Sequence, residues 1–420
     1  MKILAISNVF PPGFIGGYEL AALEILQRLT AKGHLISVLT SDYFRDDENA
    51  ISGISVERSL ECKALSHERH IAGAHLREDA FLNWGNIRKI GSAIRREKPD
   101  LVFLFNTGGL GNVALYQYLK ATSVSTITCL MDNIFAKAHE HSSEWQKYEG
   151  IFGPLKAEDL GRVFTVSDTL MHEFERVMPG IGKIIDFVPC FIDPSLFPAA
   201  HGGDRETGIP PKGRRFVFCS RVTPHKGTVV LLDAVEKLAR RGITDFSVDV
   251  FGAGQVTHFQ QEVTRRQLDG CIRYMGVFPR SEMIAKYRDY DALLFPTWER
   301  EPFGFVVCEA AASGCVPIMT AAMGASEWYL DGIDCLKIDR TSDGLMQAML
   351  QFICLSDPDL AKIRQAAIDN TCRNLSIDRW INVIEEICLA AVEDGLPVAY
   401  DQLSRVESAF LVLKEIWRDI

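Results

Sequence analysis

Residues 297–318 read TWEREPFGFVVCEAAASGCVPI, and this stretch fixes the alternation of elements around it. An apolar, β-rich run ends near Pro296, and residues 302–313 then form an apolar segment that begins with Pro-Phe-Gly. Gly314 ends this segment, and a new apolar run starts at Val316. The stretch therefore predicts a strand, a buried helix and a second strand, which is the repeating unit of a doubly wound parallel sheet.

The same alternation continues in both directions along the chain. The residues after Gly17 and residues 228–242 have apolar side chains at helical spacing, as expected for crossover helices. Short apolar runs that we predict to be strands lie at residues 2–8, 35–41, 101–106, 124–131 and 162–167, and again at 216–220, 246–252, 272–277, 292–297, 316–320 and 335–339. Because the series restarts, the sequence predicts two similar sheets.

The length of 420 residues also favours two domains, since a chain of this size exceeds one ordinary hydrophobic core. Residues 198–213 are polar, carry Gly and Pro and lack either periodicity, as an exposed linker would. We predict a first domain at 1–197, a second at 214–375 and a helical C-terminal extension at 376–420. The fold class is α/β, with two Rossmann-like domains whose strand ends face a central cleft.

The amphipathic pattern of the C-terminal extension predicts that it packs on the domains. One expected apolar face holds Trp380, Ile384, Ile387 and Cys388, and another holds Phe410, Leu413 and Trp417.

Composition excludes several classes of protein. The net charge is -10 and neither half is strongly basic, which argues against a nucleic-acid groove. Eleven cysteines are scattered without metal-ligand spacing, a pattern that suits a reducing cytoplasm. Because it contains no run of about 18 apolar residues, the sequence predicts no transmembrane helix, and the protein is expected to be soluble or attached peripherally to a membrane.

Two carboxylates in the opening stretch need an explanation. Glu301 lies just before the expected helix, and Glu309 lies inside its apolar run FVVCEAAA. An unpaired carboxylate costs several kcal/mol to bury, so a ligand diol would satisfy Glu309. One carboxylate could hold sugar hydroxyls and the other a ribose diol, while a satisfied structural carboxylate is the alternative.

Two further loops follow predicted strands. Arg221 and Lys226 would bracket the cleft and could neutralise the charge on a departing diphosphate, although a solvated basic loop has the same spacing. Gly16 and Gly17 could let backbone N–H groups approach a phosphate, but a plain turn that starts a helix explains them equally well.

Together these residues resemble the retaining glycosyltransferase family 4, which has the GT-B fold. Glu301 and Glu309 match its E-x7-E motif, with Phe303-Gly304 inside it. The similarity runs over residues 1–375 and includes Gly16-Gly17, Glu19, Arg221, Lys226-Gly227, Gly252-Ala253-Gly254, Asp291, Pro296 and the segment GASEWYLDGIDCLKI.

The resemblance implies a nucleotide-sugar donor, bound mainly by the second domain, and a catalytic set of Arg221, Lys226 and Glu301. Glu309 would bind the ribose. The other donor-binding positions that it implies are Gly16, Gly17, Gly252, Val277, Phe278, Phe303, Gly304 and Phe305. Members of the family retain anomeric configuration and need no divalent ion, so we expect neither metal nor cofactor. The commonest donor among them is a UDP-sugar.

Acceptor binding is implied for Glu19 and Asp132, although the acceptor itself is not encoded in a recurrent signature. Many members of the family place a His-Asp pair where this chain has Met131-Asp132, so this chain lacks that His and departs from the family pattern there. His139 and His141 follow closely, but their spacing is not that of a metal site.

We therefore predict a retaining, metal-independent glycosyltransferase that transfers a sugar from a nucleotide-diphosphate sugar to an unidentified acceptor. A non-hydrolysing sugar-nucleotide epimerase and a catalytically silent sugar-nucleotide-binding subunit are the alternatives. A dehydrogenase is disfavoured, because the first βα turn lacks the dinucleotide fingerprint.

Overall fold

The structure is a computed structural model of the 420-residue chain, and it divides into two units. Unit 1 comprises Met1–Val188 and Ile381–Ile420, and unit 2 comprises Pro189–Trp380. The residues described are all except 14–15, 44–50, 63–82, 134–138, 140–142, 198–212, 299, 396–397, 399, 401–402 and 419–420.

Unit 1 is built on a parallel sheet with the strand order β3-β2-β1-β4-β5-β6-β7. The order reverses between β1 and β4, whose residues pair in parallel register from Ile3 opposite Leu101 onward. Its strands are β1 Lys2–Ser7, β2 Leu35–Ser41, β3 Ile54–Leu60, β4 Leu101–Leu104, β5 Thr126–Leu130, β6 Arg162–Thr165 and β7 Ile185–Phe187. The central strands β1, β4 and β5 are buried almost throughout, because helices cover both faces of the sheet.

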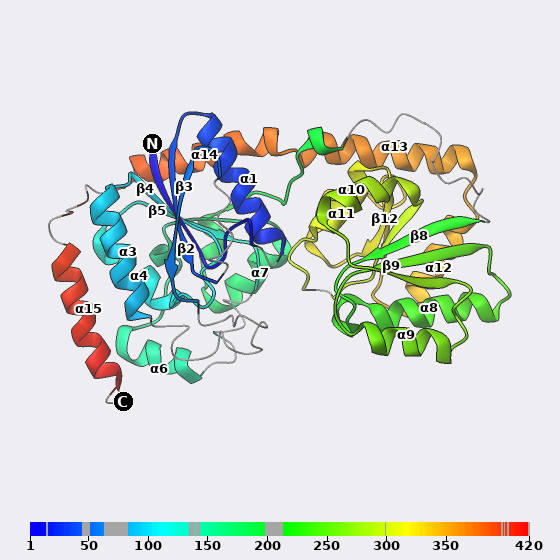
Figure 1. Ribbon diagram of the computed structural model, residues 1–420, viewed down its shortest axis with the longest axis horizontal. Helices are drawn as coiled ribbons and strands as arrows, with labels where there is room; N and C mark the ends of the chain where they lie inside the picture. Colours follow the sequence, from blue (N-terminus) through cyan, green and yellow to red (C-terminus); the bar gives the residue numbers. More distant parts are fainter. Residues whose placement is uncertain are drawn as a thin grey trace. The chain divides into compact units, whose positions relative to one another are not determined.

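The helices of unit 1 are α1 Gly17–Ala31, α3 Trp84–Glu97, α4 Asn112–Thr122, α6 Ser143–Phe152, α7 Asp168–Val177, α14 Ile377–Glu393 and α15 Leu403–Arg418. Figure 1 shows α1 on one side of the strands and α3 and α4 on the other. Helix α15 packs on α3 and α4, where Glu407 forms an ion pair with Arg95 and accepts a hydrogen bond from Tyr118.

Helix α14 joins the two units in sequence, since its first residues belong to unit 2 and the rest to unit 1. In unit 1 its Glu385 pairs with Lys32 at 2.7 Å and with His34 at 2.7 Å, beside the start of β2. These contacts attach α14 at the amino ends of the strands, which leaves the carboxyl ends to the loops.

Unit 2 has a second parallel sheet, with the order β10-β9-β8-β11-β12-β13. Its strands are β8 Arg214–Cys219, β9 Phe246–Phe251, β10 Ile272–Gly276, β11 Ala292–Phe295, β12 Val316–Thr320 and β13 Leu336–Ile338. The order again reverses, here between β8 and β11. Loops that follow these two strands therefore diverge at one point of the carboxyl edge, where open α/β sheets bind ligands.

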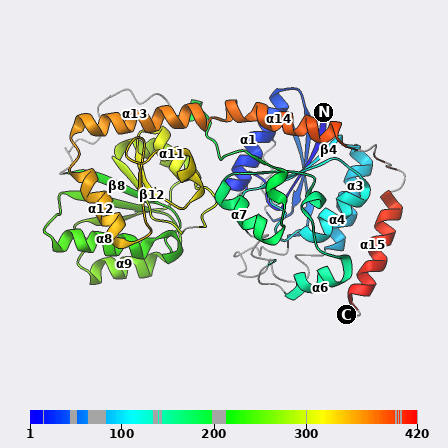
Figure 2. The ribbon, with the colours of Figure 1, turned by 180° about the vertical axis from the view of Figure 1, so that it is seen from behind.

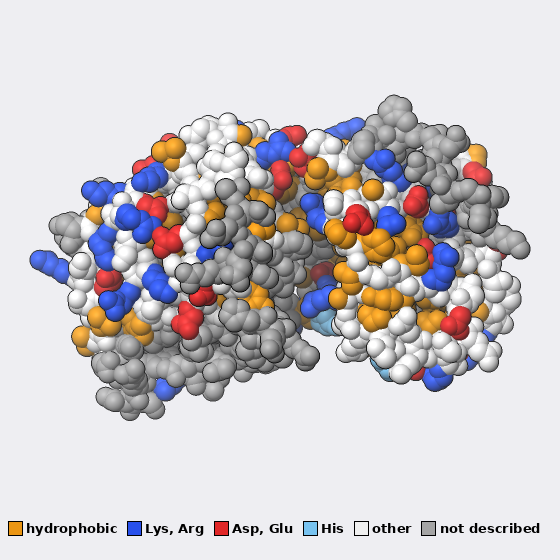
Figure 3. Space-filling model, in the orientation of Figure 1, with side chains coloured by type: hydrophobic (Ala, Val, Ile, Leu, Met, Phe, Trp, Pro, Cys, Tyr) orange, Lys and Arg blue, Asp and Glu red, His pale blue; other side chains and the backbone are white. Residues whose placement is uncertain are grey.

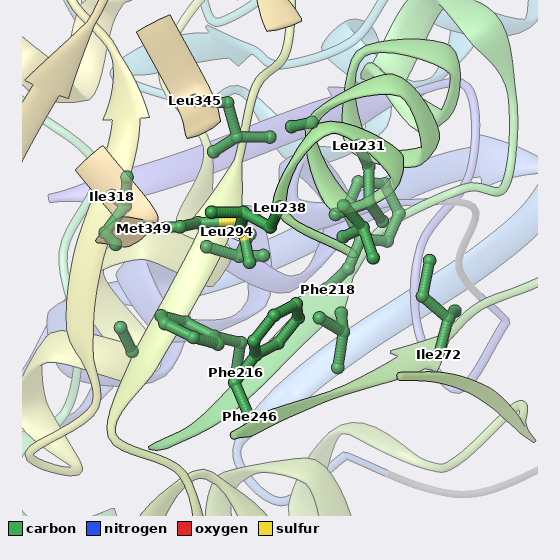
Figure 4. Packing of buried hydrophobic residues seen from close by; sticks show 14 of the residues in the cluster. Phe216, Phe218, Leu231, Leu238, Phe246, Ile272, Leu294, Ile318, Leu345 and Met349 are labelled. Carbon is green, nitrogen blue, oxygen red and sulfur yellow. The ribbon is translucent and has the colours of Figure 1, made fainter. Parts of the chain in front are cut away.

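Two layers of helices cover this second sheet (Figures 1 and 2). They are α8 Thr228–Arg240, α9 Val256–Arg265 and α12 Ser342–Ile353 on one face, and α10 Arg280–Lys286, α11 Phe305–Ala312 and α13 Asp357–Asn374 on the other. Figure 4 shows the core under the first layer, where Leu231 and Leu238 of α8 and Met349 of α12 lie over Phe216 and Leu294 of the sheet. All five side chains are fully buried, so this core fixes the strand ends that carry the site.

The structure confirms every predicted strand to within a few residues and adds β3 and β7. The run Ile54–Leu60 has only a weak apolar alternation, since four of its residues are half-buried, and β7 has just three residues. Both segments form strands because they pair with neighbouring strands, although their own sequence patterns do not predict a strand.

The domain borders differ from the sequence prediction. Residues 189–197 belong to unit 2, not to the first domain, and residues 381–420 belong to unit 1, not to a separate extension. The reason lies in packing, because Ile192 bridges to Ser376 whereas Glu385 and Glu407 contact unit 1. The expected apolar face of Trp380, Ile384, Ile387 and Cys388 is buried, while the side chains of Phe410, Leu413 and Trp417 lie outside the described residues.

On the face shown in Figure 3, Lys and Arg side chains are interspersed with Asp and Glu side chains. Within the described ranges, no helix has the length and apolar character needed to cross a membrane.

Candidate active site

The centre of the site in unit 2 is an ion pair between two residues that the sequence singled out separately. Nζ of Lys226 lies 2.5 Å from Oε2 of Glu301, and the two side chains are 12% and 11% exposed. The hydroxyl of Thr297, which is fully buried, donates to the same Oε2 at 2.9 Å. Oε1 of Glu301 accepts no hydrogen bond from the described part of the chain, so it can receive a hydroxyl of a ligand.

Lys226 is positioned by the backbone around it. It ends the 3₁₀ turn Pro224–Lys226, and the guanidinium of Arg340 donates to the carbonyls of Pro224 and His225 at 3.0 and 3.1 Å. Gly227 then has φ 94°, and a Cβ there would lie 2.0 Å from the carbonyl oxygen of Pro296. Only glycine allows the turn to pass this close to the loop that carries Glu301.

Arg221 lies in the same loop and is exposed. Its guanidinium makes no hydrogen bond or ion pair with other described residues. A guanidinium without such contacts reorients at little cost in free energy, so it can move to bind an anionic ligand. Arg221 and Lys226 thus both follow β8. Lys226 forms an ion pair with Glu301, whereas Arg221 forms none with the described residues.

Gly252 allows the backbone at the end of β9 to pass close to the neighbouring loops. It has φ 137°, and a Cβ there would meet the carbonyl oxygen of Ser220 at 1.9 Å. Its N–H donates to the carbonyl of Gly276 at 3.0 Å, and its own carbonyl accepts from the hydroxyl of Tyr274 at 3.0 Å. The glycine is therefore required by close packing of the loops after β8, β9 and β10.

The residues expected near the base follow β10. Val277 is 64% exposed, which leaves its side chain and backbone open to a ligand. The ring of Phe278 packs edge-on against Phe251 at 5.3 Å between centroids, and Nζ of Lys286 lies 4.9 Å from its centre. The packing of Phe278 thus fixes the conformation of the loop, and Val277 is the residue of the pair that a ligand can contact.

The start of α11 is fixed by its neighbours. Gly304 is the N-cap with φ 105°, and a Cβ there would contact the ring of Phe295 at 3.0 Å. The N–H of Ala325 donates to the carbonyl of Phe303, whose side chain is buried, and Phe305 is the first helical residue. The N–H of Val307 donates to the carbonyl of Gly304 at 3.0 Å, and the helix dipole favours a polar or anionic group at this end of α11.

Glu309, one turn further into α11, is 7% exposed and has a partner that the sequence did not predict. Nε of Arg280, the first residue of α10, donates to its Oε1 at 2.5 Å. Burial raises the pKa of the Glu309 carboxyl, and the charge of Arg280 partly reverses this rise.

The donor-side glycines of unit 1 begin α1. Gly16 is the N-cap in an extended conformation, φ -160°, and a Cβ there would meet no atom within 4 Å. Its N–H donates to Oε2 of Glu19 at 2.8 Å, and Gly17 is the first helical residue. The structure therefore gives Glu19 a capping role at the helix start, which the sequence did not predict.

Asp132 lines a small pocket at the carboxyl ends of β4 and β5, together with Met131, Tyr18, Thr107 and Tyr116. Burial raises the pKa of Tyr116 to about 12, and it raises the pKa of Tyr18 as well; the Asp132 carboxylate adds to both shifts. The two phenols are thus neutral hydrogen-bonding groups at ordinary pH. The pocket fits binding of hydroxyl groups, and Met131 contributes an apolar wall.

His139 contacts one aromatic ring and one carboxylate among the described residues. Its ring packs on Trp145 at 5.0 Å, and its Nε2 lies 3.6 Å from Glu149. His141 lies outside the described residues. The sequence predicts that acceptor identity depends chiefly on loops at residues 42–85 and 133–158, and within them 44–50, 63–82, 134–138 and 140–142 also lie outside the described residues. In the described part of the chain, no three His, Cys, Asp or Glu side chains gather as metal ligands.

Sequence reasoning missed Thr297, Arg280 and Arg340. Thr297 directly follows the Pro296 that ends the strand, and Arg280 directly follows Phe278-Pro279, so their positions were available signals. The sequence did not show that these side chains pair with Glu301 and Glu309. Arg280 and Glu309 belong to helices that follow different strands, and the bond from Thr297 to Glu301 depends on how the loop after β11 folds back on itself.

Comparisons with known proteins identify the family of this chain. Residues 15–196 match the model of Glycosyltransferase Family 4, and residues 213–354 match that of Glycosyl transferases group 1, so the two models cover most of the chain. The phosphatidyl-myo-inositol mannosyltransferase of Mycobacterium tuberculosis is 29% identical over 308 residues, which are 71% of this chain and 72% of that protein.

Two solved structures have the same fold. A glycosyltransferase from Rickettsia africae superposes with a TM-score of 0.69 at 18% identity, covering 94% of this chain and 99% of that one. HepE of Anabaena, in complex with UDP and glucose, gives 0.66 at 17% identity, covering 93% and 100%. The expected GT-B fold is confirmed, and the chain belongs to family 4 of the glycosyltransferases and is an enzyme of that class.

Proposed function

We propose that this glycosyltransferase transfers a sugar from a nucleotide-diphosphate sugar to a hydroxyl acceptor with retention of anomeric configuration and without a divalent metal. The observation that carries the proposal is the ion pair of Lys226 with Glu301, beside the exposed Arg221. Two cations follow β8, and Glu301 follows the neighbouring strand β11. Its Oε1 accepts no hydrogen bond from the described residues, so it is available to a ligand.

The cations suit the leaving group. When the bond between the anomeric carbon and the phosphate oxygen breaks, negative charge grows on the diphosphate, and Lys226 and Arg221 would stabilise it. Lys226 has three N–H donors, so it can keep Glu301 and still reach a phosphate oxygen. Fixed cations do here what a divalent ion does in other transferases.

The carboxylates suit the sugar and the ribose. Oε1 of Glu301 would accept from a sugar hydroxyl, and Glu309 would accept from the ribose diol. The acceptor oxygen would form the new bond on the face that the phosphate leaves, and its proton would pass to the leaving phosphate. No protein nucleophile is then needed.

A UDP-sugar is the donor that we favour, and HepE, which shares the fold, has been solved with UDP and with UDP-glucose. Val277, which is exposed after β10, would lie near the base. We place the enzyme in the cytoplasm, because its eleven cysteines are free thiols. Asp132 and its neighbouring phenols would bind the acceptor, and peripheral contact with a membrane would follow if that acceptor is lipid-linked.

A thermal-shift screen against UDP-, GDP-, ADP- and TDP-sugars with EDTA present tests the proposal. A ligand at ~100 times its dissociation constant stabilises by about 2.7 kcal/mol. Stabilisation by the UDP series, followed by NMR of the product anomer, would support a retaining UDP-dependent enzyme. Stabilisation that disappears with EDTA would contradict metal independence, and no shift with any donor would contradict the proposal.

A further inference from the structure

The Glu309 carboxylate lies in surroundings that disfavour its charged form. It sits on α11 between Cys308 and Ala310, both fully buried, and only 7% of its side chain is exposed. A carboxyl group in such a place tends to keep its proton, because burial penalises the anion. A protonated carboxyl would be a poorer acceptor for two neighbouring hydroxyls than a carboxylate with both oxygens available.

Arg280 provides the opposing charge from a different element. Its Nε donates to Oε1 of Glu309 at 2.5 Å, and its side chain is 34% exposed. The guanidinium thus reaches from solvent to the buried carboxylate. Oε2 of Glu309 accepts no hydrogen bond from the described residues, so one oxygen is held and the other is open.

The other titratable groups around Glu309 carry no charge at neutral pH. They are Cys219 at the end of β8, Tyr287 in the 3₁₀ turn Tyr287–Asp289, and Cys308 on α11 itself. Burial raises the pKa of Cys219 to about 11, that of Cys308 to about 12 and that of Tyr287 as well. Among the described residues, Arg280 is therefore the charged group in contact with this carboxylate.

We propose that Arg280 is a positioning residue, which holds Glu309 as an oriented carboxylate for the ribose diol of the donor. This inference rests on the proposed function, in which Glu309 binds the ribose. Arg280 acts through Glu309 and need not touch the nucleotide. Without Arg280, nothing among the described residues would oppose the effect of burial, so the pKa of the carboxyl would rise further and the group would lose affinity for the diol.

Calorimetric titration of UDP into wild type, Arg280→Gln and the exposed control Arg241→Gln, at several pH values from 6.5 to 9, tests this role. The ratio of the dissociation constants of variant and wild type cancels the titration of UDP itself. For Arg280→Gln we expect a ratio of about 10 at pH 6.5 that falls toward 1 at pH 9, because one pKa unit changes the ionised fraction about tenfold. Arg241→Gln should give a ratio near 1 throughout.

Two more variants separate positioning from direct contact. Arg280→Lys keeps the charge and should restore most of the affinity. In the Glu309→Gln background, Arg280→Gln should add no pH-dependent loss, since no carboxyl remains to titrate. Melting temperatures of all variants check that they fold.

A ratio near 1 at every pH would overturn the proposal. A large ratio that does not change with pH would overturn it too, because a pH-independent loss is what direct contact with UDP or a merely structural role of Arg280 predicts. Failure of the wild type to bind UDP would overturn the proposed donor, and this role with it. These results are distinguishable, because the role of Arg280 can fail only in experiments in which the wild type binds UDP.

Discussion

Nζ of Lys226 and Oε2 of Glu301 lie 2.5 Å apart, and each side chain is almost nine-tenths buried. The two residues come from loops that follow β8 and β11, the strands at which the order of the sheet reverses. A cation expected at the diphosphate and a carboxylate expected at the sugar therefore form one structural group. Mutation of either residue should affect both folding and catalysis.

Lys226→Ala should lower the free energy of unfolding by about 3 kcal/mol, because it leaves the buried Glu301 carboxylate without its cation. Arg221→Ala should change it by less than about 0.5 kcal/mol, since Arg221 is exposed and unpaired among the described residues. Urea denaturation of both variants measures the difference. Equal stabilities would show that the ion pair contributes nothing to the folded state.

Both variants should nevertheless lose turnover. Removal of one preorganised charge stabiliser typically costs ~100-fold or more in kcat. Lys237→Ala is the matched control, because Lys237 pairs with Asp343 elsewhere on unit 2. Steady-state kinetics with a UDP-sugar gives the comparison, and undiminished rates in Arg221→Ala and Lys226→Ala would exclude the leaving-group role.

Thr297→Val should lower kcat about tenfold while the donor KM changes little, because the lost hydrogen bond orients Oε2 of Glu301 and does not touch the nucleotide. Thr297→Ser keeps the hydroxyl and should retain most of the activity. The Ser variant separates this effect from the loss of a buried methyl group. If both substitutions reduce kcat alike, packing and not the hydroxyl is responsible.

Gly252→Ala should destabilise unit 2 by about 3 kcal/mol or more, since φ is 137° and the added Cβ would lie 1.9 Å from the carbonyl oxygen of Ser220. Gly16→Ala should cost less than about 1 kcal/mol, because its backbone is extended and the space beside it is open. Thermal denaturation of the two variants checks the contrast. A Gly16→Ala variant that is stable but inactive would place a substrate at that loop.

Cys219 should react slowly with iodoacetamide at pH 7.5, because burial raises the pKa of its thiol to about 11 and the thiolate is the nucleophile. The rate should rise nearly tenfold per pH unit until the pH reaches this value. Cys354, which is exposed, should be labelled first. Peptide mass spectrometry resolves the two sites, and rapid labelling of Cys219 at pH 7.5 would contradict the raised pKa of its thiol.

Local sequence determined much of the fold. Apolar runs of strand length and helical spacing between them predicted the strands of both sheets, because a parallel sheet covered on both faces needs continuous apolar strands. Segments with a weak pattern were missed. The residues Ile54–Leu60 and Ile185–Phe187 became strands only because neighbouring strands offered hydrogen bonds.

The sequence by itself also determined which residues compose the candidate site, since E-x7-E, Arg221, Lys226 and the glycines stand at predicted strand ends. Only the tertiary structure decided how they pair. Lys226 holds Glu301, Arg280 holds Glu309, and Glu19 caps α1 in addition to any role at a substrate. The physical reason is distance along the chain: the first two contacts join residues 75 and 29 positions apart, and no local propensity encodes which segments a sheet brings together.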